Sequence, residues 1–250
     1  MGKECYQNKS LQSLLRCLDA DSIQDDIKMV FSIIAAKLLS NYHIVKGEST
    51  YDFLEIEFYF YSPKHRDLIT YPRNSNKPGM WFFHMSGVDI TFGSDDNKDN
   101  QPLMYGGILV RSIVKTHGDS STLPKYICGP MKCVDELFDY INAFDGDISR
   151  ADIPYIVEKK VNEKVSIGSC SRYIPWLFEN DDKVKSKFEE LKKKRIEKDG
   201  ESHEYSEKEF EDFVDNLKRP YRFYRNDFDE WMKGYNAKPK VQKTNCKEYK

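Results

Sequence analysis

The stretch Leu54–Arg73, LEIEFYFYSPKHRDLITYPR, limits the possible folds of this chain more than any other segment. Its first eight residues alternate between two kinds of side chain, which is the pattern of a β-strand with two different faces. One face would pack against a core and carries Leu54, Ile56, Phe58 and Phe60. The opposite face would be turned either to water or to a pocket and carries Glu55, Glu57, Tyr59 and Tyr61.

Length and charge limit the class of protein. A chain of 250 residues is long enough for one large domain with insertions. The formal net charge of −2 gives no overall basic field, so nucleic-acid binding would need a local patch. The longest apolar run, Met29–Leu39, is too short to span a bilayer, and the first ten residues lack the apolar centre of a secretory signal. We therefore expect a cytoplasmic protein with reduced cysteines and no membrane association.

The remaining periodicity predicts an α+β protein. Helical spacing of apolar residues indicates helices over 9–24, 25–40, 131–144 and 206–218. Alternation or short apolar runs indicate strands near 51–61, 80–85, 88–92, 106–115, 154–158, 164–168 and 220–224. Phe228–Tyr235 would form a short helix or turn.

The predicted domain organisation has three parts. Residues 1–24 form an N-terminal helical segment, 25–235 form the main domain, and 236–250 form a disordered basic tail. Within the main domain, residues 178–218 read as an inserted helical hairpin whose second helix opens with a capping box, Ser206 and Glu209. The basic run Lys192–Arg195 is either a solvated helix face or a phosphate-contact patch.

Arg111 is the one cation inside the apolar run of the predicted strand GGILVRSIVK, residues 106–115. Such a residue either sits on a wet face or needs an anionic partner, because an unpaired buried charge is costly. The sequence leaves both readings open. The five histidines and six cysteines show no metal-ligand spacing, and phosphate-binding glycine motifs are absent. We therefore expect neither a metal nor an organic cofactor.

The order of several short motifs resembles that of the alkyladenine (3-methyladenine, methylpurine) DNA glycosylase family. That family carries, in order, an ETEAY strand, a histidine followed by TPRN, PG before an aromatic strand, an apolar strand ending in LLR, GPxKL, (R/V)GI and PxRFY. The matching series here spans most of the chain and consists of EIEFY (55–59), His65 followed by Pro72-Arg73-Asn74, Pro78-Gly79, GGILVRSI (106–113), GPMK (129–132), VSIG (165–168) and RPYRFY (219–224).

The resemblance implies a fold and a reaction. The fold would be a single methylpurine-DNA-glycosylase-like domain with a curved, mostly antiparallel sheet surrounded by helices. The reaction would be base-excision hydrolysis of the N-glycosidic bond of a modified purine flipped out of DNA. Glu57 matches the general base of the family, and Arg111 matches the arginine that helps to hold the attacking water. A Glu57–Arg111 pair across neighbouring strands would satisfy both charges.

The resemblance also implies binding residues. Tyr59 matches a base-stacking tyrosine, and His65 matches a pocket histidine. The second stacking tyrosine of the family falls near Phe83 or His84. DNA contacts are expected at Arg73, Lys132 and Arg222. Arg219, Arg222 and Arg225 alternate with aromatic residues, which suits either a nucleic-acid backbone or an ordinary strand with one wet face.

Two departures from the family, a missing wedge and a missing asparagine, favour a second hypothesis, and the added helical hairpin offers a surface for a protein partner. The place of the residue that plugs the vacated base position is taken by Ser86-Gly87, so only Met85 remains for that role. The asparagine of the following strand has no counterpart, and the 178–218 hairpin is an addition. The alternative is a divergent, non-catalytic member that binds nucleic acid, a nucleotide or a protein partner.

Overall fold

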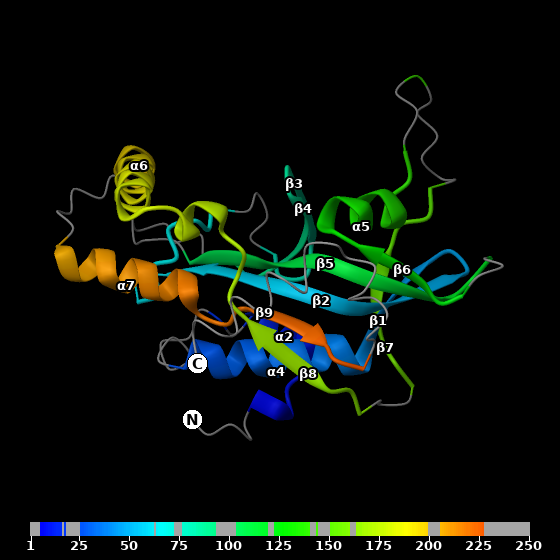
Figure 1. The fold of residues 1–250 in the computed structure, drawn as a ribbon. Coiled ribbons are helices and arrows are strands. Elements are labelled where there is room, and N and C mark those ends of the chain that lie inside the picture. The colour runs from blue at the N-terminus through cyan, green and yellow to red at the C-terminus, as the bar shows by residue number, and fades with distance from the viewer. Residues whose placement is uncertain are drawn as a thin grey trace.

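The strands of the protein form one curled antiparallel sheet, and helices pack around it. The computed structural model describes residues 6–16, 18, 26–62, 64–72, 77–93, 104–119, 123–140, 144, 151–160, 164–199 and 206–227. Within these ranges the fold is α+β, as the sequence predicts (Figure 1). The predicted helix or turn over 228–235 and the predicted tail over 236–250 lie outside the described residues.

Two strands of 13 residues each, β2 (Ser49–Tyr61) and β5 (Tyr105–His117), form the middle of the sheet. The strand order is β3-β4-β5-β2-β1-β7, while β6 pairs with β5, and β9 pairs with both β2 and β8. The other strands are β1 (Tyr42–Lys46), β3 (Trp81–His84), β4 (Gly87–Thr91), β6 (Lys125–Cys128), β7 (Tyr155–Glu158), β8 (Ile167–Cys170) and β9 (Arg222–Arg225). The edge of β2 that faces away from β5 is therefore shared by β1 and β9.

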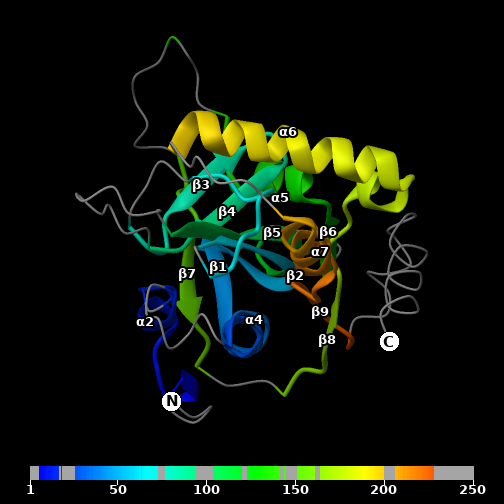
Figure 2. The same ribbon diagram turned by 90° about the vertical axis from the view of Figure 1, so that its left-hand side faces the viewer.

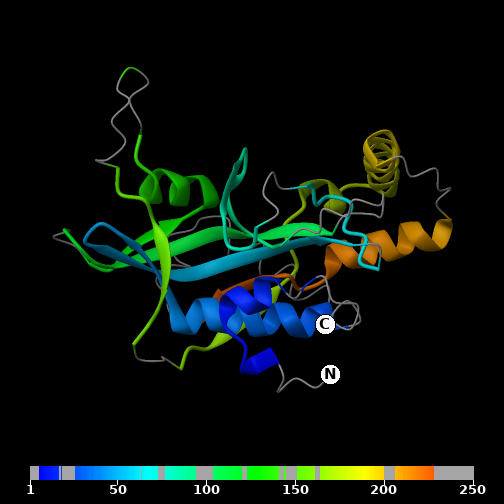
Figure 3. The same cartoon turned by 180° about the vertical axis from the view of Figure 1, so that it is seen from behind.

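Helices cover the two faces of this sheet unequally. α4 (Ile27–Asn41) lies along one face, and α2 (Leu11–Arg16) packs beside it (Figure 3). The β3–β4 hairpin, α5 (Pro130–Leu137) and α6 (Asp181–Asp199) lie on the other side (Figures 1 and 2). The 3₁₀ helix η3 (Pro175–Phe178) leads into α6, and α7 (Glu207–Lys218) follows it. The predicted capping box of α7 is confirmed, since Ser206 accepts from the amide of Glu209 and the Glu209 carboxylate accepts from the amide of Ser206.

Phe31 of α4 lies at the centre of the main core. Its ring stacks on Phe58 of β2, with ring centroids 4.4 Å apart, and meets the edge of Tyr221 at 4.9 Å. Ile56 and Phe60 of β2 face the same core, as the alternating pattern predicts. Residues of α2 belong to this core too, so the predicted N-terminal segment is packed into the main body of the fold.

One predicted helix is shorter than its sequence pattern. The pattern indicates a helix to Phe144, but α5 ends at Leu137 and Phe138 is extended. The Phe138 ring instead meets Trp81 at 5.6 Å and Phe83 at 4.6 Å between ring centroids. Contact with these β3 aromatics explains why the chain leaves the helix there.

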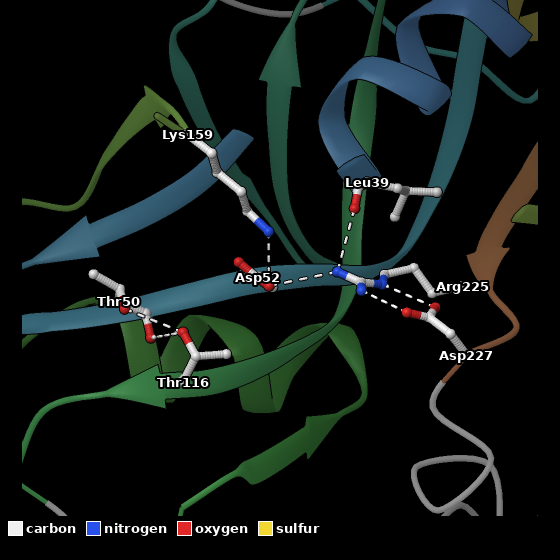
Figure 4. Close-up of polar contacts among 7 residues, drawn as sticks. All are labelled: Leu39, Thr50, Asp52, Thr116, Lys159, Arg225 and Asp227. Carbon is white, nitrogen blue, oxygen red and sulfur yellow. Dashed lines mark hydrogen bonds and ion pairs between the residues drawn. The ribbon is translucent and has the colours of Figure 1, made fainter. Parts of the chain in front are cut away.

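An ion-pair cluster joins four segments at the far end of β2 (Figure 4). The Asp52 carboxylate lies 2.8 Å from Lys159 Nζ and 3.4 Å from Arg225 Nη1. Arg225 also donates to the carbonyl oxygen of Leu39 and pairs with Asp227. Because Arg225 is 3% exposed in side chain, it is part of the scaffold and its guanidinium does not face solvent.

We expect Phe31→Ala to lower the free energy of unfolding by about 3–5 kcal/mol, because it leaves a cavity beneath the middle of the sheet. Urea denaturation at pH 7 measures this change. Tyr140→Ala is the matched control, since Tyr140 is 90% exposed, and should change stability by less than about 0.5 kcal/mol. Equal losses in the two variants would contradict the assigned core.

Candidate functional site

Glu57 lies in the middle of β2 with neighbouring strands on both sides. It is paired with Leu109 of β5 and with Arg222 of β9, and it is 1% exposed. The same row continues from Leu109 to Asp89 of β4. Directly paired residues point to the same side of a sheet, so Glu57, Leu109 and Asp89 share one face. Ile56 and Phe58 point to the opposite face, toward α4.

Two register shifts in the β2–β5 pair lie next to this carboxylate. Leu54 is an extra residue on β2, between the pairs Phe53–Ile113 and Glu55–Ser112. Arg111 is an extra residue on β5, between Glu55–Ser112 and Ile56–Val110. A bulge re-aims its side chain, and bulges are common beside active sites. The predicted grouping of Leu54 with Ile56 is wrong for this reason: Leu54 packs with Val114 in a separate small cluster.

Arg111 is directed at both glutamates of β2. Its Nη1 lies 3.0 Å from Glu57 Oε2, and its Nε lies 3.7 Å from Glu55 Oε1. The predicted Glu57–Arg111 pair is therefore present. The Arg111 side chain is 14% exposed, so this cation lies at the boundary between the buried row and solvent.

Tyr59 completes the contacts of Glu57. Its hydroxyl donates to Glu57 Oε1. Burial raises the pKa of Tyr59 well above its usual value, and the Glu57 carboxylate adds to this while Arg172 and Arg111 oppose it. The phenol thus keeps its proton at neutral pH and acts as a donor. Tyr59 is half-buried, and it lies on the same strand face as Glu57.

Glu55 has a supporting role. It is 0% exposed, its Oε1 accepts from Arg222 Nε at 2.5 Å, and its Oε2 accepts from the Ser112 hydroxyl at 2.9 Å. The prediction that Arg222 contacts DNA is wrong, because Arg222 is 1% exposed and its guanidinium is held against Glu55. With Arg225 buried as well, β9 supplies two scaffold cations, and the exposed arginine of this region is Arg219, which caps the C-terminus of α7.

A second buried ion pair lies against Tyr59. Arg172 follows β8, is 0% exposed and donates through Nη1 to Asp67 Oδ2 at 2.5 Å. Its guanidinium carbon lies 4.9 Å from the centre of the Tyr59 ring. Although burial opposes the charge, the Asp67 carboxylate holds the pKa of Arg172 above its ordinary value.

His65 does not line the Glu57 site. It is 2% exposed and packs on Phe60 and Tyr221, with ring centroids 6.0 Å and 5.6 Å away. Phe60 alternates with Tyr59 along β2 and faces the main core, so the prediction of a pocket-wall histidine is wrong. The backbone explains this position, since His65 and Ser62 form a bridge that turns the chain back over Phe60.

His84 lies toward the same sheet face as Glu57 but is held by Asp89. Its Nε2 lies 3.0 Å from Asp89 Oδ1, while its Nδ1 accepts from the amide of Ser86. Asp89 belongs to the row of Glu57, two strand spacings or about 10 Å along the sheet. Phe82 stacks on His84 at 6.1 Å, and Tyr71 meets its edge at 6.0 Å. These aromatics make a wall beside the site.

Phe83 and Met85 lie at the outer end of the β3–β4 hairpin. Phe83 is 53% exposed, alternates with His84 and contacts Phe138, so the prediction that it lines the site is wrong. Met85 is 98% exposed in the turn between the two strands. The hairpin stands out from the sheet on the side of α5 and α6 (Figures 1 and 2).

Two predicted DNA-contact residues remain. Lys132 is exposed on α5, whereas Arg73 lies outside the described residues. Within the described ranges, no group of three or more histidine, cysteine, aspartate or glutamate side chains is arranged to hold a metal ion. No helix in the same ranges is long and apolar enough to cross a bilayer.

The sequence reading missed four residues around Tyr59 and His84: Asp67, Phe82, Asp89 and Arg172. The strand alternation of MWFFHM and VDITF does place Phe82 with His84 and isolates Asp89 between apolar neighbours. No local pattern marks Asp67 or Arg172, because the two residues are 105 positions apart and meet only through the fold.

Comparisons with known proteins give no relative for this chain. No family model, no curated protein and no solved structure matches it. The chemistry of the site therefore rests on its own geometry.

Burial lowers the pKa of His65 from 6.5 to about 4; the Asp67 carboxylate opposes this shift, and the Arg219 and Arg172 guanidiniums add to it. Between pH 6.5 and 4 the unfolded chain binds a proton that the folded chain does not bind. Stability is thus present above pH 6.5 and is lost as the pH falls. Between pH 7.5 and 4.5 we expect the free energy of unfolding of the wild type to fall by about 2–3 kcal/mol more than that of the His65→Gln variant. Urea unfolding of both proteins measures this difference. The same pH dependence in both proteins would rule out a buried neutral histidine.

Proposed function

We propose that this protein is a base-excision DNA glycosylase-like hydrolase that cleaves the N-glycosidic bond of a modified purine. The observation that carries the proposal is the Glu57 carboxylate, fixed between the Arg111 guanidinium and the Tyr59 hydroxyl on one face of the sheet. A general base must be held within reach of a water, and a neighbouring cation helps to orient that water. In the proposed reaction Glu57 and Arg111 would supply these two elements.

In the proposed reaction Glu57 accepts a proton from water as the water oxygen attacks the sugar carbon C1′. The bond between C1′ and the purine nitrogen breaks, and its electron pair leaves with the base. Arg111 holds the water and balances the negative charge of the carboxylate. Tyr59 offers a half-buried aromatic surface for the base, and Tyr71, Phe82 and His84 lie along the same face.

A second candidate function is a non-catalytic member that binds nucleic acid, a nucleotide or a protein partner. One observation favours it: Glu57 is 1% exposed, and its two oxygens face Tyr59 and Arg111. A reacting water must take the place of one of these contacts. Binding of damaged DNA without base release would select this alternative.

The proposal is tested by base release from oligonucleotides that carry hypoxanthine, ethenoadenine or an alkylated purine. We expect Glu57→Gln to lower the rate of release by about 10²–10⁴-fold while the affinity for the oligonucleotide is retained, since the amide cannot accept the proton. Chromatography of the free base and fluorescence anisotropy measure the two quantities. Glu189→Gln is the control, because this glutamate is 63% exposed on α6 and should leave the rate unchanged. A Glu57→Gln protein as active as the wild type would exclude this mechanism.

Met85 is the residue proposed to fill the place of the extruded base, because it is 98% exposed at the tip of the β3–β4 hairpin. Extrusion of a base from a duplex costs a few kcal/mol of stacking, which an apolar wedge offsets. We expect Met85→Ala to reduce kcat/KM on a duplex by about tenfold or more and to leave cleavage of the same base in a single strand nearly unchanged. An equal loss on both substrates would show that Met85 acts in some other way.

A further inference from the structure

Arg172 is a buried cation that the proposed reaction does not use. It is 0% exposed and donates through Nη1 to Asp67 Oδ2 at 2.5 Å and to the Phe58 carbonyl oxygen at 3.3 Å. Among the described residues its Nε and Nη2 have no hydrogen-bond partner. The guanidinium instead lies over two aromatic rings, with its carbon 4.9 Å from the centre of Tyr59 and 5.7 Å from that of Tyr221. This is cation–π packing against the residue that donates to Glu57.

The segments that carry this ion pair pack against α6 and α7, the two helices of the predicted hairpin, which cross each other (Figures 1 and 2) and are here called the α6–α7 hairpin. A cluster of apolar side chains, here called the hairpin cluster, joins the hairpin to the sheet and contains Tyr61, Leu68, Tyr105, Ile174, Phe188, Phe213 and Leu217. Leu68 follows Asp67 directly, and Ile174 lies two residues after Arg172. Both halves of the ion pair thus come from segments anchored in the hairpin cluster.

A hydrogen bond ties the two ends of the hairpin insertion together beside Arg172. The Ser171 hydroxyl donates to the carbonyl oxygen of Lys218, the last residue of α7, at 2.5 Å. Asp67 is fixed independently by the Thr70 hydroxyl at 2.9 Å. Arg172 therefore lies between two anchored points, the Ser171–Lys218 hydrogen bond on one side and the Asp67 carboxylate of the 64–72 loop on the other.

We propose that the α6–α7 hairpin is a support for the candidate site: it holds the Asp67–Arg172 pair against the Tyr59 ring and thereby keeps the Tyr59 hydroxyl on Glu57. Arg172 is a positioning residue in this account, because it acts through Tyr59 and not on the substrate. The inference rests on the proposed function for its effect on the rate. Its structural part, the coupling of Arg172 to Tyr59, stands apart from any activity.

A mutant cycle on the rate tests the proposal. Asp67→Asn with Arg172→Met removes both charges, so that neither remains buried without its partner. We expect this double variant to lower kcat on the order of 10²-fold with KM little changed, because the Tyr59 hydroxyl loses its place. In a Tyr59→Phe background, which lacks that hydroxyl, the same double variant should have no further effect. The single variant Arg172→Lys keeps the charge but not the planar stacking, so it should retain part of the rate that the double variant loses.

The hairpin itself is tested by Phe213→Ala, since Phe213 belongs to the hairpin cluster and is 2% exposed. We expect it to lower kcat in the wild-type background and not in Tyr59→Phe. The matched control is Asp52→Asn with Lys159→Met, an ion pair whose carboxylate lies on β2 at the end opposite Tyr59 and whose lysine follows β7 (Figure 4). That control should change kcat by less than about twofold in either background.

Two results would overturn the inference. In the first, the Asp67/Arg172 changes and Tyr59→Phe lower kcat by factors that multiply when they are combined. In the second, kcat falls equally in the Asp52/Lys159 control. If the wild type releases no base, the proposed function fails and the unfolding equilibrium decides the structural part. The effects of Tyr59→Leu and of the Asp67/Arg172 changes on the unfolding equilibrium constant should then fall short of multiplying, because each removes the same packing. Independent, multiplying effects there would disprove the coupling.

Discussion

The fold depends on one electrostatic requirement, which is the neutralisation of two adjacent carboxylates inside the sheet. Glu55 and Glu57 are 0% and 1% exposed, and a buried carboxylate without a partner costs several kcal/mol. Arg111 from β5 and Arg222 from β9 supply the opposite charges. A slip of β2 by one residue would turn Glu57 toward Phe31 and the main core, so the charges fix the register as strictly as the apolar face does.

This requirement explains the position of β9 and the tolerance of the long insertion before it. Arg222 must return to the edge of β2, although α6 and α7 come between it and β8 in the chain. The Ser171–Lys218 hydrogen bond and the hairpin cluster hold the two ends of the insertion together, so that β8 and β9 still pair as neighbours. The insertion is thus not an appendage. Its base contacts a chain of polar side chains, which consists of Arg222, Glu55, Arg111, Glu57, Tyr59, Arg172 and Asp67.

The periodicity of apolar residues predicts much of the fold, because α4, β2 and α7 each carry a clear apolar face or a capping signal. It failed where tertiary contacts override local pattern: α5 stops at Leu137 because Phe138 joins the β3 aromatics, and Leu54 changes sides at a bulge. The resemblance of the sequence motifs to the glycosylase family also predicts the Glu57–Arg111 pair. The roles of His65 and Arg222 were not predicted, because burial of a polar residue depends on which distant segment covers it.

The same contacts that keep Glu57 in place also limit what it can do. Arg111 neutralises the carboxylate and Tyr59 donates a hydrogen bond to its Oε1, while the Glu57 side chain is left almost without contact to solvent. The two contacts are not equal in their support. Tyr59 is backed by the Asp67–Arg172 pair, whereas Arg111 lies at a bulge and is 14% exposed. A water that enters between Arg111 and Glu57 comes from the partly exposed side and leaves Arg111 close to both glutamates, while displacement of Tyr59 disturbs its packing against a buried ion pair. Water therefore has its lower-cost route to Glu57 on the Arg111 side, and Tyr59 is the fixed wall against which that water would be held.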